Sequence, residues 1–282
     1  MQYSSATCVQ VKEGGDRDGS TVNSQRQVTE PAPNVCGGTD VGLVREHNED
    51  AFYVSGDGRL LVVADGMGGH MAGEVASALA VDTLRDVLQA TRRREMDAGE
   101  AEAAAVLRAA FDAAHRRVLE AAEARPECRG MGTTLILGYV SGDALHTCHV
   151  GDVRCYIRGA DGLLQVTDDH SVVAALVRSG KLSPAAARVH TRRHEILQAV
   201  GLGSGITADV HARGLRPGDL VLLCSDGLWE MVPDDQIGAI LDNGHSLRDR
   251  VQALLDGANR AGGRDNVTVV LYQHGGAAAE GG

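Results

Sequence analysis

Acidic residues recur where predicted strands end, and most of them stand beside a glycine. The set comprises Asp65-Gly66, Asp152 after Gly151, Asp226-Gly227 and Asp265-Asn266. A strand that runs into Asp-Gly places a carboxylate at the rim of a sheet, and the glycine lets an ion or a phosphate approach the backbone closely. Mg²⁺ and Mn²⁺ prefer carboxylate, carbonyl and water oxygens in octahedral geometry. If these rims converge, the sequence predicts a site for one of these ions rather than for zinc.

Glu49 and Asp50 add two more acids close to Arg45. An arginine among carboxylates is a natural phosphate anchor, because its planar guanidinium can hold two oxygens at once. Each part also has a simpler explanation. A single Asp-Gly is most often only a turn, and Arg45 could form a surface ion pair of little energetic worth. The conjunction of these residues favours metal-assisted hydrolysis of phosphate esters.

Short apolar strands alternating with helices must position these residues. Gly56-Asp57-Gly58 between two strand-like runs is typical of a hairpin. Hairpin strands alternating with pairs of helices predict antiparallel sheets packed by helices, rather than a regular βαβ winding. The predicted strands are 51–54, 60–64, 133–140, 144–150, 154–158, 219–224 and 266–272. One predicted helix begins at Gly73, and the others span 101–124, 172–189 (broken at Gly180 and Pro184), 234–241 and 247–260.

Composition divides the chain and limits its partners. Residues 1–38 lack any period and are expected to be a disordered leader, 39–274 a folded domain, and 275–282 a disordered tail. A formal net charge of -11 argues against a nucleic-acid partner and against an anionic membrane surface. No apolar run approaches the roughly 20 residues that a membrane span needs. The six cysteines form no CxxC pair, so we expect reduced thiols in a cytoplasmic protein.

The motifs resemble those of a known family, the PPM or type 2C-like metal-dependent serine/threonine protein phosphatases, in its bacterial branch. The resemblance covers nearly the whole folded part, and the order and spacing of the motifs both match. The matching blocks are 42–50 (GLVREHNED), 63–70 (VADGMGGH), 73–77 (GEVAS), 130–134 (GMGTT), 150–154 (VGDVR), 169–171 (DHS), 224–229 (CSDGLW) and 263–268 (GRDNVT).

This resemblance implies an α+β fold in four layers, αββα, in which two antiparallel sheets are flanked by helices and a metal centre lies in a cleft at one end. It also implies two Mn²⁺ or Mg²⁺ ions, which would activate a shared water for in-line attack on phosphorus, without a phosphoenzyme intermediate. The implied roles are as follows: Asp65 bridges both ions, the Gly66 carbonyl binds one, Asp226 and Asp265 hold the other, Glu49 and Asp50 act largely through water, Arg45 holds the substrate phosphate, and Asp152 with Asp226 matches the place of a third ion.

Three departures from the family pattern concern proton supply and substrate choice. Met67 stands where many eukaryotic relatives have a histidine proposed as general acid, so the leaving group must gain its proton from elsewhere. Val153 replaces a usual serine. Thr191 and His194 replace a common proline and asparagine in the segment His190 to Gly201, which resembles a mobile flap beside the cleft.

The resemblance implies phosphorylated proteins as partners. The enzyme would oppose a Ser/Thr kinase or act on regulators of sigma factors, and we expect a monomer. The alternative is a catalytically silent phosphoprotein-binding module of the same fold, which missing acids would have favoured; none is missing.

Other motifs have less specific interpretations. The stretch Gly66 to Gly73 lacks the Gly-Lys-Ser/Thr ending of a nucleotide loop, and His146 and His149 lack the context of a zinc site. His70 could reach the cleft but is explained as well by a helix start, and Trp229 as a packing residue.

Overall fold

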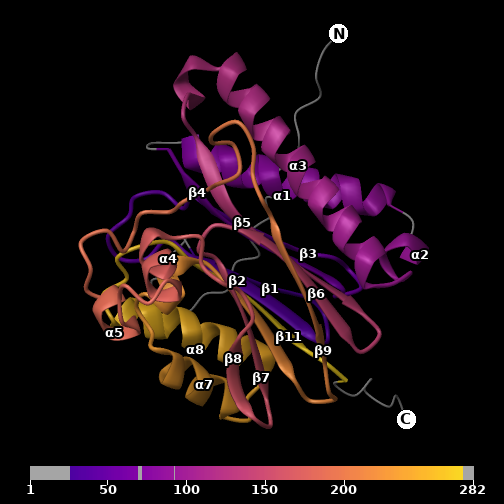
Figure 1. The fold of residues 1–282 in the computed structure, drawn as a ribbon. Coiled ribbons are helices and arrows are strands. Elements are labelled where there is room, and N and C mark those ends of the chain that lie inside the picture. The colour runs from indigo at the N-terminus through magenta and orange to yellow at the C-terminus, as the bar shows by residue number, and fades with distance from the viewer. Residues whose placement is uncertain (1–25, 69–71, 92, 276–282) are drawn as a thin grey trace, which may run out of the picture.

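The computed structural model describes residues 26–68, 72–91 and 93–275. Two antiparallel sheets pack face to face, and helices cover the outer side of each (Figure 1). The first sheet has the order β1 (Arg26–Ala32), β2 (Val35–Asp40), β11 (Val267–Gln273), β10 (Leu220–Cys224), β7 (Arg154–Gly159) and β8 (Gly162–Gln165), and the second has β3 (Asp50–Val54), β4 (Leu60–Met67), β5 (Gly132–Ser141), β6 (Ala144–Val150) and β9 (Asp209–Gly214). The expected αββα arrangement is confirmed.

The helices divide between the two outer faces. Two of them, α1 and α3, pack against the second sheet, whereas α8 packs against β11 and β2 of the first. The helices are α1 (Ala72–Ala90), α2 (Arg93–Met96), α3 (Glu100–Ala124), α4 (Val172–Arg178), α5 (Pro184–Ala187), α6 (Asp226–Trp229), α7 (Asp234–Asp242) and α8 (Leu247–Arg260), with a 3-10 turn η1 (Pro126–Cys128). Among the described residues, no helix is both long and apolar enough to cross a membrane.

Three apolar layers hold these elements together, and the strand pattern explains why. In β10, Leu222 contributes to the layer beneath α7 and α8, while its neighbours Val221 and Leu223 contribute to the layer between the sheets. In β4, Val62 packs towards α1 and α3, and Leu61 packs towards the other sheet. A strand buried on both faces carries a continuous apolar run, which is why these short runs were recognisable.

The expectation of a disordered leader is wrong for residues 26–38. These residues form β1 and β2, and β2 lies inside the first sheet between β1 and β11. Gly37 and Gly38 look like loop residues, but they fit a crowded site. A Cβ on Gly37 would lie 2.5 Å from the Phe52 ring, and one on Gly38 would lie 2.7 Å from Val251 of α8. Residues 1–25 and 276–282 lie outside the described residues.

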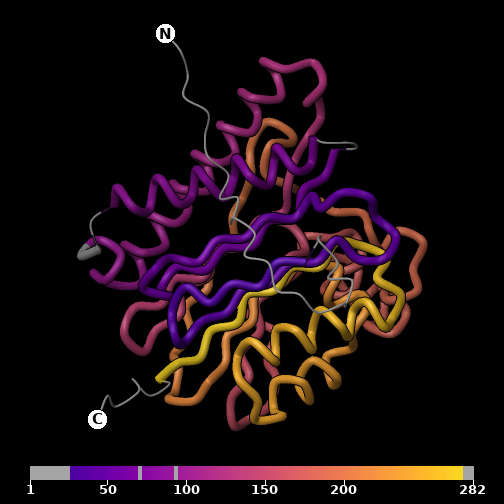
Figure 2. The backbone as a smooth tube through the Cα atoms, turned by 180° about the vertical axis from the view of Figure 1, so that it is seen from behind, coloured from indigo at the N-terminus to yellow at the C-terminus, as the bar shows by residue number. Residues whose placement is uncertain are grey.

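Other differences are smaller. The strands β8 and β9 were not predicted, because both are short and only partly buried. The helical region predicted at 172–189 is two helices, α4 and α5, each capped by a serine whose hydroxyl accepts a backbone N–H bond. Seen from behind, β2 lies beside β11, the last described strand (Figure 2).

Candidate metal centre

The acids predicted from the sequence come together because their strands end at the same edge of the molecule. Asp50 begins β3 and lies opposite Asp65 of β4 in the antiparallel ladder. Asp226 follows β10, and Asp265 precedes β11, which pairs with β10. Asp152 is the second residue after the end of β6. Segments up to 220 residues apart in the sequence, as Arg45 and Asp265 are, therefore meet at one site.

These residues share a cleft with a volume of about 580 Å³. Seven of the eight predicted site residues line it, and Asp50 lies behind them. The lining residues are Arg45, Glu46, His47, Glu49, Asp65, Gly66, Met67, Gly68, Thr134, Asp152, His194, Ile196, Asp226, Asp265 and Asn266. The predicted convergence of strand rims is thus present in the fold. His70 lies outside the described residues.

Backbone contacts fix the loop that carries Arg45 and Glu49. The Glu49 N–H donates to Asn266 Oδ1 at 2.8 Å, and the Glu49 carbonyl accepts bonds from the Gly66 N–H and the Ser77 hydroxyl. A Cβ on Gly66 would collide with the carbonyl oxygen of Gly73. Glycine is therefore required at this position by close packing of backbone against backbone.

Two residues that position the acids were not assigned a role from the sequence. Asn266 also donates from Nδ2 to the carbonyls of Val41 and His47, each at 2.9 Å. Ser225 donates from its hydroxyl to Asp50 Oδ2 at 2.8 Å and accepts the N–H of Thr268. Both stand beside a predicted acid in the sequence, which is the signal that could have found them.

The carboxylates strongly perturb one another. Burial raises the pKa of Asp65 well above its usual range, and the negative charge of Asp226 adds to the effect. Burial, followed by repulsion from Asp152, raises the pKa of Asp226 in the same way. Burial also raises the pKa of Asp50 to about 7, although the neighbouring Thr268 and Ser225 lower it. A compact cluster of acids with so little compensating positive charge calls for cations.

The residues present fit divalent ions. Among the described residues, Asp50 Oδ1 and Asp226 Oδ1 are buried side-chain oxygens without a hydrogen-bond partner. A buried oxygen of this kind carries a desolvation cost unless something binds it. The donors around the cleft are carboxylate and carbonyl oxygens, which suit Mg²⁺ or Mn²⁺ better than softer ions.

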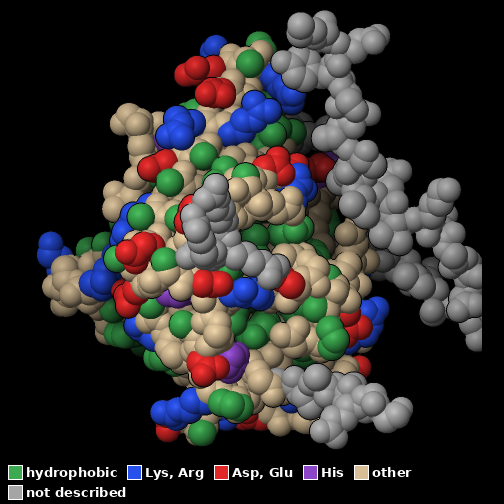
Figure 3. All heavy atoms as spheres, turned by 90° about the vertical axis from the view of Figure 1, so that its right-hand side faces the viewer, with side chains coloured by type: hydrophobic (Ala, Val, Ile, Leu, Met, Phe, Trp, Pro, Cys, Tyr) green, Lys and Arg blue, Asp and Glu red, His purple; other side chains and the backbone are tan. Residues whose placement is uncertain are grey.

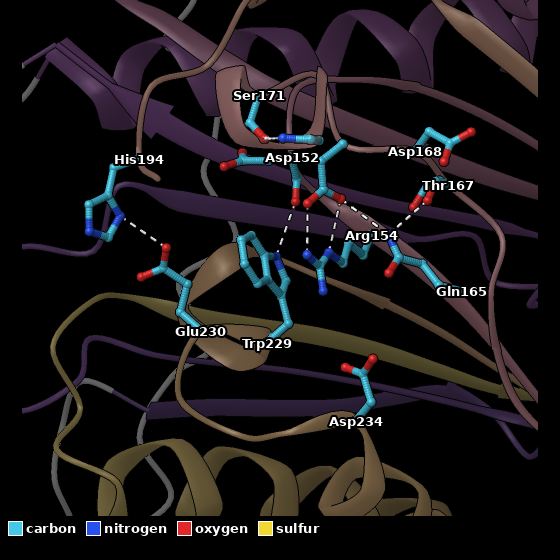
Figure 4. A network of polar contacts seen from close by, with 12 residues as sticks. Asp152, Arg154, Gln165, Thr167, Asp168, Ser171, His194, Trp229, Glu230 and Asp234 are labelled. Atoms are coloured by element: carbon cyan, nitrogen blue, oxygen red, sulfur yellow. Dashed lines mark hydrogen bonds and ion pairs between the residues drawn. The ribbon is translucent and has the colours of Figure 1, made fainter. Parts of the chain in front are cut away.

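A separate network holds Asp152 in place (Figure 4). The Trp229 indole N–H donates to the Asp152 carbonyl at 3.1 Å, and the Arg154 guanidinium lies 3.6 Å above the Trp229 ring. Arg154 also makes two bonds to Asp169, of 2.9 and 2.7 Å. Trp229 therefore does more than pack. Burial, with repulsion from Asp169, raises the pKa of Asp152 to about 7.

The three departures from the family pattern occupy different places. Met67 lines the cleft, so no imidazole is present at that position. Val153 is fully buried in the layer between the sheets. His194 lines the cleft, and its Nδ1 lies 2.9 Å from a Glu230 carboxylate oxygen (Figure 4).

The two histidines dismissed as zinc ligands are buried. His149, His170 and Asp209 do offer ligand atoms within 4.8 Å of one another. However, His170 Nδ1 accepts bonds from the Gly151 N–H and the Gln198 amide, so the hydrogen-bond network assigns the ring proton to Nε2. Nε2 then donates to Asp209 Oδ2 at 3.2 Å. We therefore interpret the cluster as a hydrogen-bonded support for the loop before Asp152.

Comparison with known proteins gives the family. The protein phosphatase 2C family model matches residues 44–268. The chain belongs to the protein phosphatase 2C family. A serine/threonine phosphatase, stp, from Listeria welshimeri is 37% identical over 238 residues, covering 83% of this chain and 93% of the relative.

Solved structures of this phosphatase family agree with the fold described above. The Mycobacterium tuberculosis serine/threonine phosphatase PstP/Ppp has a TM-score of 0.74 and 37% identity, covering 85% of this chain and 97% of that one. The PstP catalytic domain in complex with two manganese ions has a TM-score of 0.75 and 36% identity, covering 85% of this chain and 96% of that one. The chain described here is therefore a protein-serine/threonine phosphatase, and the relative of known structure that holds two manganese ions is 36% identical to it.

Proposed function

We propose that Asp65, Gly66, Asp226 and Asp265 hold the two ions, with Asp65 between them. The observation that carries this assignment is the pair of buried, unpartnered oxygens on Asp50 and Asp226, since Asp50 pairs with Asp65 in the ladder and Asp226 shares the cleft with Asp65. When bound, the ions lower the pKa of a water molecule and neutralise the phosphoryl oxygens. The Gly66 carbonyl is included because Gly66 lines the cleft beside Asp65.

In this proposal the remaining residues orient the reactants. Arg45 binds the substrate phosphate, since its guanidinium is half exposed in the cleft and can present two N–H groups to phosphate oxygens. Glu49 and Asp50 orient water around the ions. Asp50 is held by Ser225 and leaves its other oxygen free for this purpose.

A third ion is proposed at Asp152 and Asp226. The negative charge of Asp152 acts on the pKa of Asp226, and both carboxylates line the cleft. The Trp229 and Arg154 network fixes the backbone of Asp152 for this role.

The phosphatase acts, in this proposal, as a cytoplasmic monomer on proteins phosphorylated by a bacterial Ser/Thr kinase. Support comes from its relatives, which include the protein phosphatase PhpP of Streptococcus pneumoniae, at 35% identity over 83% of this chain.

Hydrolysis of p-nitrophenyl phosphate and of a phosphothreonine peptide tests the site. We expect turnover with Mn²⁺, less or none with chelator, and at least a 100-fold loss in Asp226→Asn. The same substitution should raise the melting temperature of the metal-free protein, because it removes a buried charge from a repulsive cluster. Full activity in Asp226→Asn would overturn the assignment. A matched control is Asp86→Asn, which changes an exposed acid on α1.

A further inference from the structure

One segment beside the cleft carries a single sign of charge. Residues 172–194, from the start of α4 past α5 to the cleft, contain five Lys or Arg residues and no Asp or Glu, in a chain whose net charge is -11. We call this stretch the basic segment. Its five cations are Arg178, Lys181, Arg188, Arg192 and Arg193.

Most of this charge is uncompensated. Arg192 pairs with Glu195, and Arg178 donates to the Asp169 carbonyl. Lys181, Arg188 and Arg193 form no ion pair with any described acid. Between Arg188 and His190 stands Val189, which is 80% exposed. The surface therefore combines free positive charge with an open apolar side chain.

The basic segment is anchored beside the mouth of the cleft. The Val172 N–H bonds to the Glu195 carbonyl at 2.9 Å, and the Leu197 N–H bonds to the His170 carbonyl at 2.7 Å. The two ends of the segment are thus tied together. His194 at its end lines the same cleft as Arg45, and α4 and α5 lie together at that side of the molecule (Figure 1).

Another face of the protein looks different. On the side turned to the viewer in Figure 3, acidic and basic side chains are interspersed, and neither sign dominates. A surface on which positive and negative side chains are interspersed has a weak net electrostatic field, whereas a cluster of charges of one sign steers ligands of the opposite charge. The basic segment is therefore not explained by the general composition of the protein surface.

We propose that the basic segment is a docking surface for acidic side chains that flank the phosphorylated residue of a substrate protein. The inference rests on the assignment of the chain as a protein-serine/threonine phosphatase. The catalytic cleft is itself lined by acids and would repel such flanking residues. The two regions thus bind different parts of one substrate: the phosphate enters the cleft, and the acidic residues that flank the phosphorylated residue bind the basic segment. Flanking lysines would be repelled by the basic segment.

Three substrates separate this proposal from the underlying activity. They are p-nitrophenyl phosphate, which has no flanking residues, and two phosphothreonine peptides that differ only in Glu or Lys at the flanking positions. At low salt we expect kcat/KM to be about tenfold higher for the Glu peptide, mainly through KM, because electrostatic steering acts on encounter. The preference should shrink at 0.5 M NaCl, where charges are screened.

The decisive variant is Lys181→Glu/Arg188→Glu, in which the charges of two exposed residues are reversed. A milder version, Lys181→Ala/Arg188→Ala, serves if the reversal lowers the melting temperature. The matched control is Arg108→Glu/Arg213→Glu, which makes the same change at exposed positions on α3 and β9. We expect the first variant to lose or invert the peptide preference and the control to keep it. Turnover of p-nitrophenyl phosphate should be equal in all of them.

Two results would overturn the proposal in distinguishable ways. If both peptides are hydrolysed and the reversal leaves the Glu preference unchanged, or no preference exists, the docking surface is wrong and the phosphatase assignment stands. If neither peptide is hydrolysed although p-nitrophenyl phosphate is, the assignment of protein substrates fails and the docking surface fails with it.

Discussion

Arg45 Nη2 donates a hydrogen bond of 2.7 Å to Asp265 Oδ2. The proposed phosphate anchor is therefore bonded to a proposed metal ligand. An ion at Asp265 would draw negative charge away from Arg45 and leave the guanidinium free for phosphate. Binding of the ion and binding of the phosphate should consequently favour each other.

Arg45→Lys tests the role of the guanidinium fork. Lysine keeps the charge but loses the bidentate geometry, and the loss of one charge-assisted bond, about 1.4 kcal/mol, corresponds to roughly a tenfold rise in KM. Steady-state kinetics with a phosphothreonine peptide would measure this rise in KM. Arg85→Lys, at an ion pair on α1, should leave KM unchanged. Equal kinetics of Arg45→Lys and wild type would contradict the anchor.

The stability of the metal-free protein should fall as the pH rises. Asp50 and Asp152 have folded pKa values of about 7, above the unfolded value of about 3.9. Such a carboxyl contributes stability fully below the unfolded pKa, and this contribution is lost as the pH rises through 7.

With Mn²⁺ the trend should reverse, because ion binding releases the protons and tightens as the pH rises. Melting temperatures between pH 5 and 8.5, with Mn²⁺ or with chelator, would show the two opposite slopes. Parallel curves would mean that these carboxyls do not bind the ions.

Trp229→Phe separates packing from hydrogen bonding at Asp152. Phenylalanine keeps an aromatic face for Arg154 but cannot donate to the Asp152 carbonyl, which costs about 1 kcal/mol. We expect a higher Mn²⁺ concentration for half-maximal turnover, with a smaller change in KM for p-nitrophenyl phosphate. An unchanged Mn²⁺ dependence would limit Trp229 to packing.

Gly37→Ala should destabilise the fold by about 1–3 kcal/mol, the usual range for overpacking. The new methyl group would press on the Phe52 ring between the sheets. Gly56→Ala is the matched control, because no atom lies within 4 Å of a Cβ at Gly56. Urea unfolding of both variants measures the difference, and equal stabilities would show that β2 tolerates a side chain.

The sequence predicted those parts of the fold in which local pattern and tertiary environment agree. β10 and the first five residues of β4 were recognisable because they are buried and uniformly apolar. β2 was missed for the opposite reason: its glycines are selected by contacts with Phe52 and Val251 that no local pattern reveals.

The candidate site divides in the same way. Asp-Gly at strand ends identified the acids, since the chemistry resides in the residue types themselves. Asn266 and Ser225 could not be assigned roles, because their function is to hold other residues, and that depends on which loops meet in space. The basic segment was overlooked because charge of one sign matters only once its place beside the cleft is known.

The pairing of β2 with β11 has a consequence for synthesis of the chain. β11 ends at Gln273 and lies between β2 and β10, so the first sheet lacks the strand that joins β2 to β10 until residues 267–273 have left the ribosome. Pairing of such distant segments slows folding. A chain that is stalled or terminated before β11 would expose the unpaired edges of β2 and β10, and we expect nascent chains to need chaperone protection until β11 emerges.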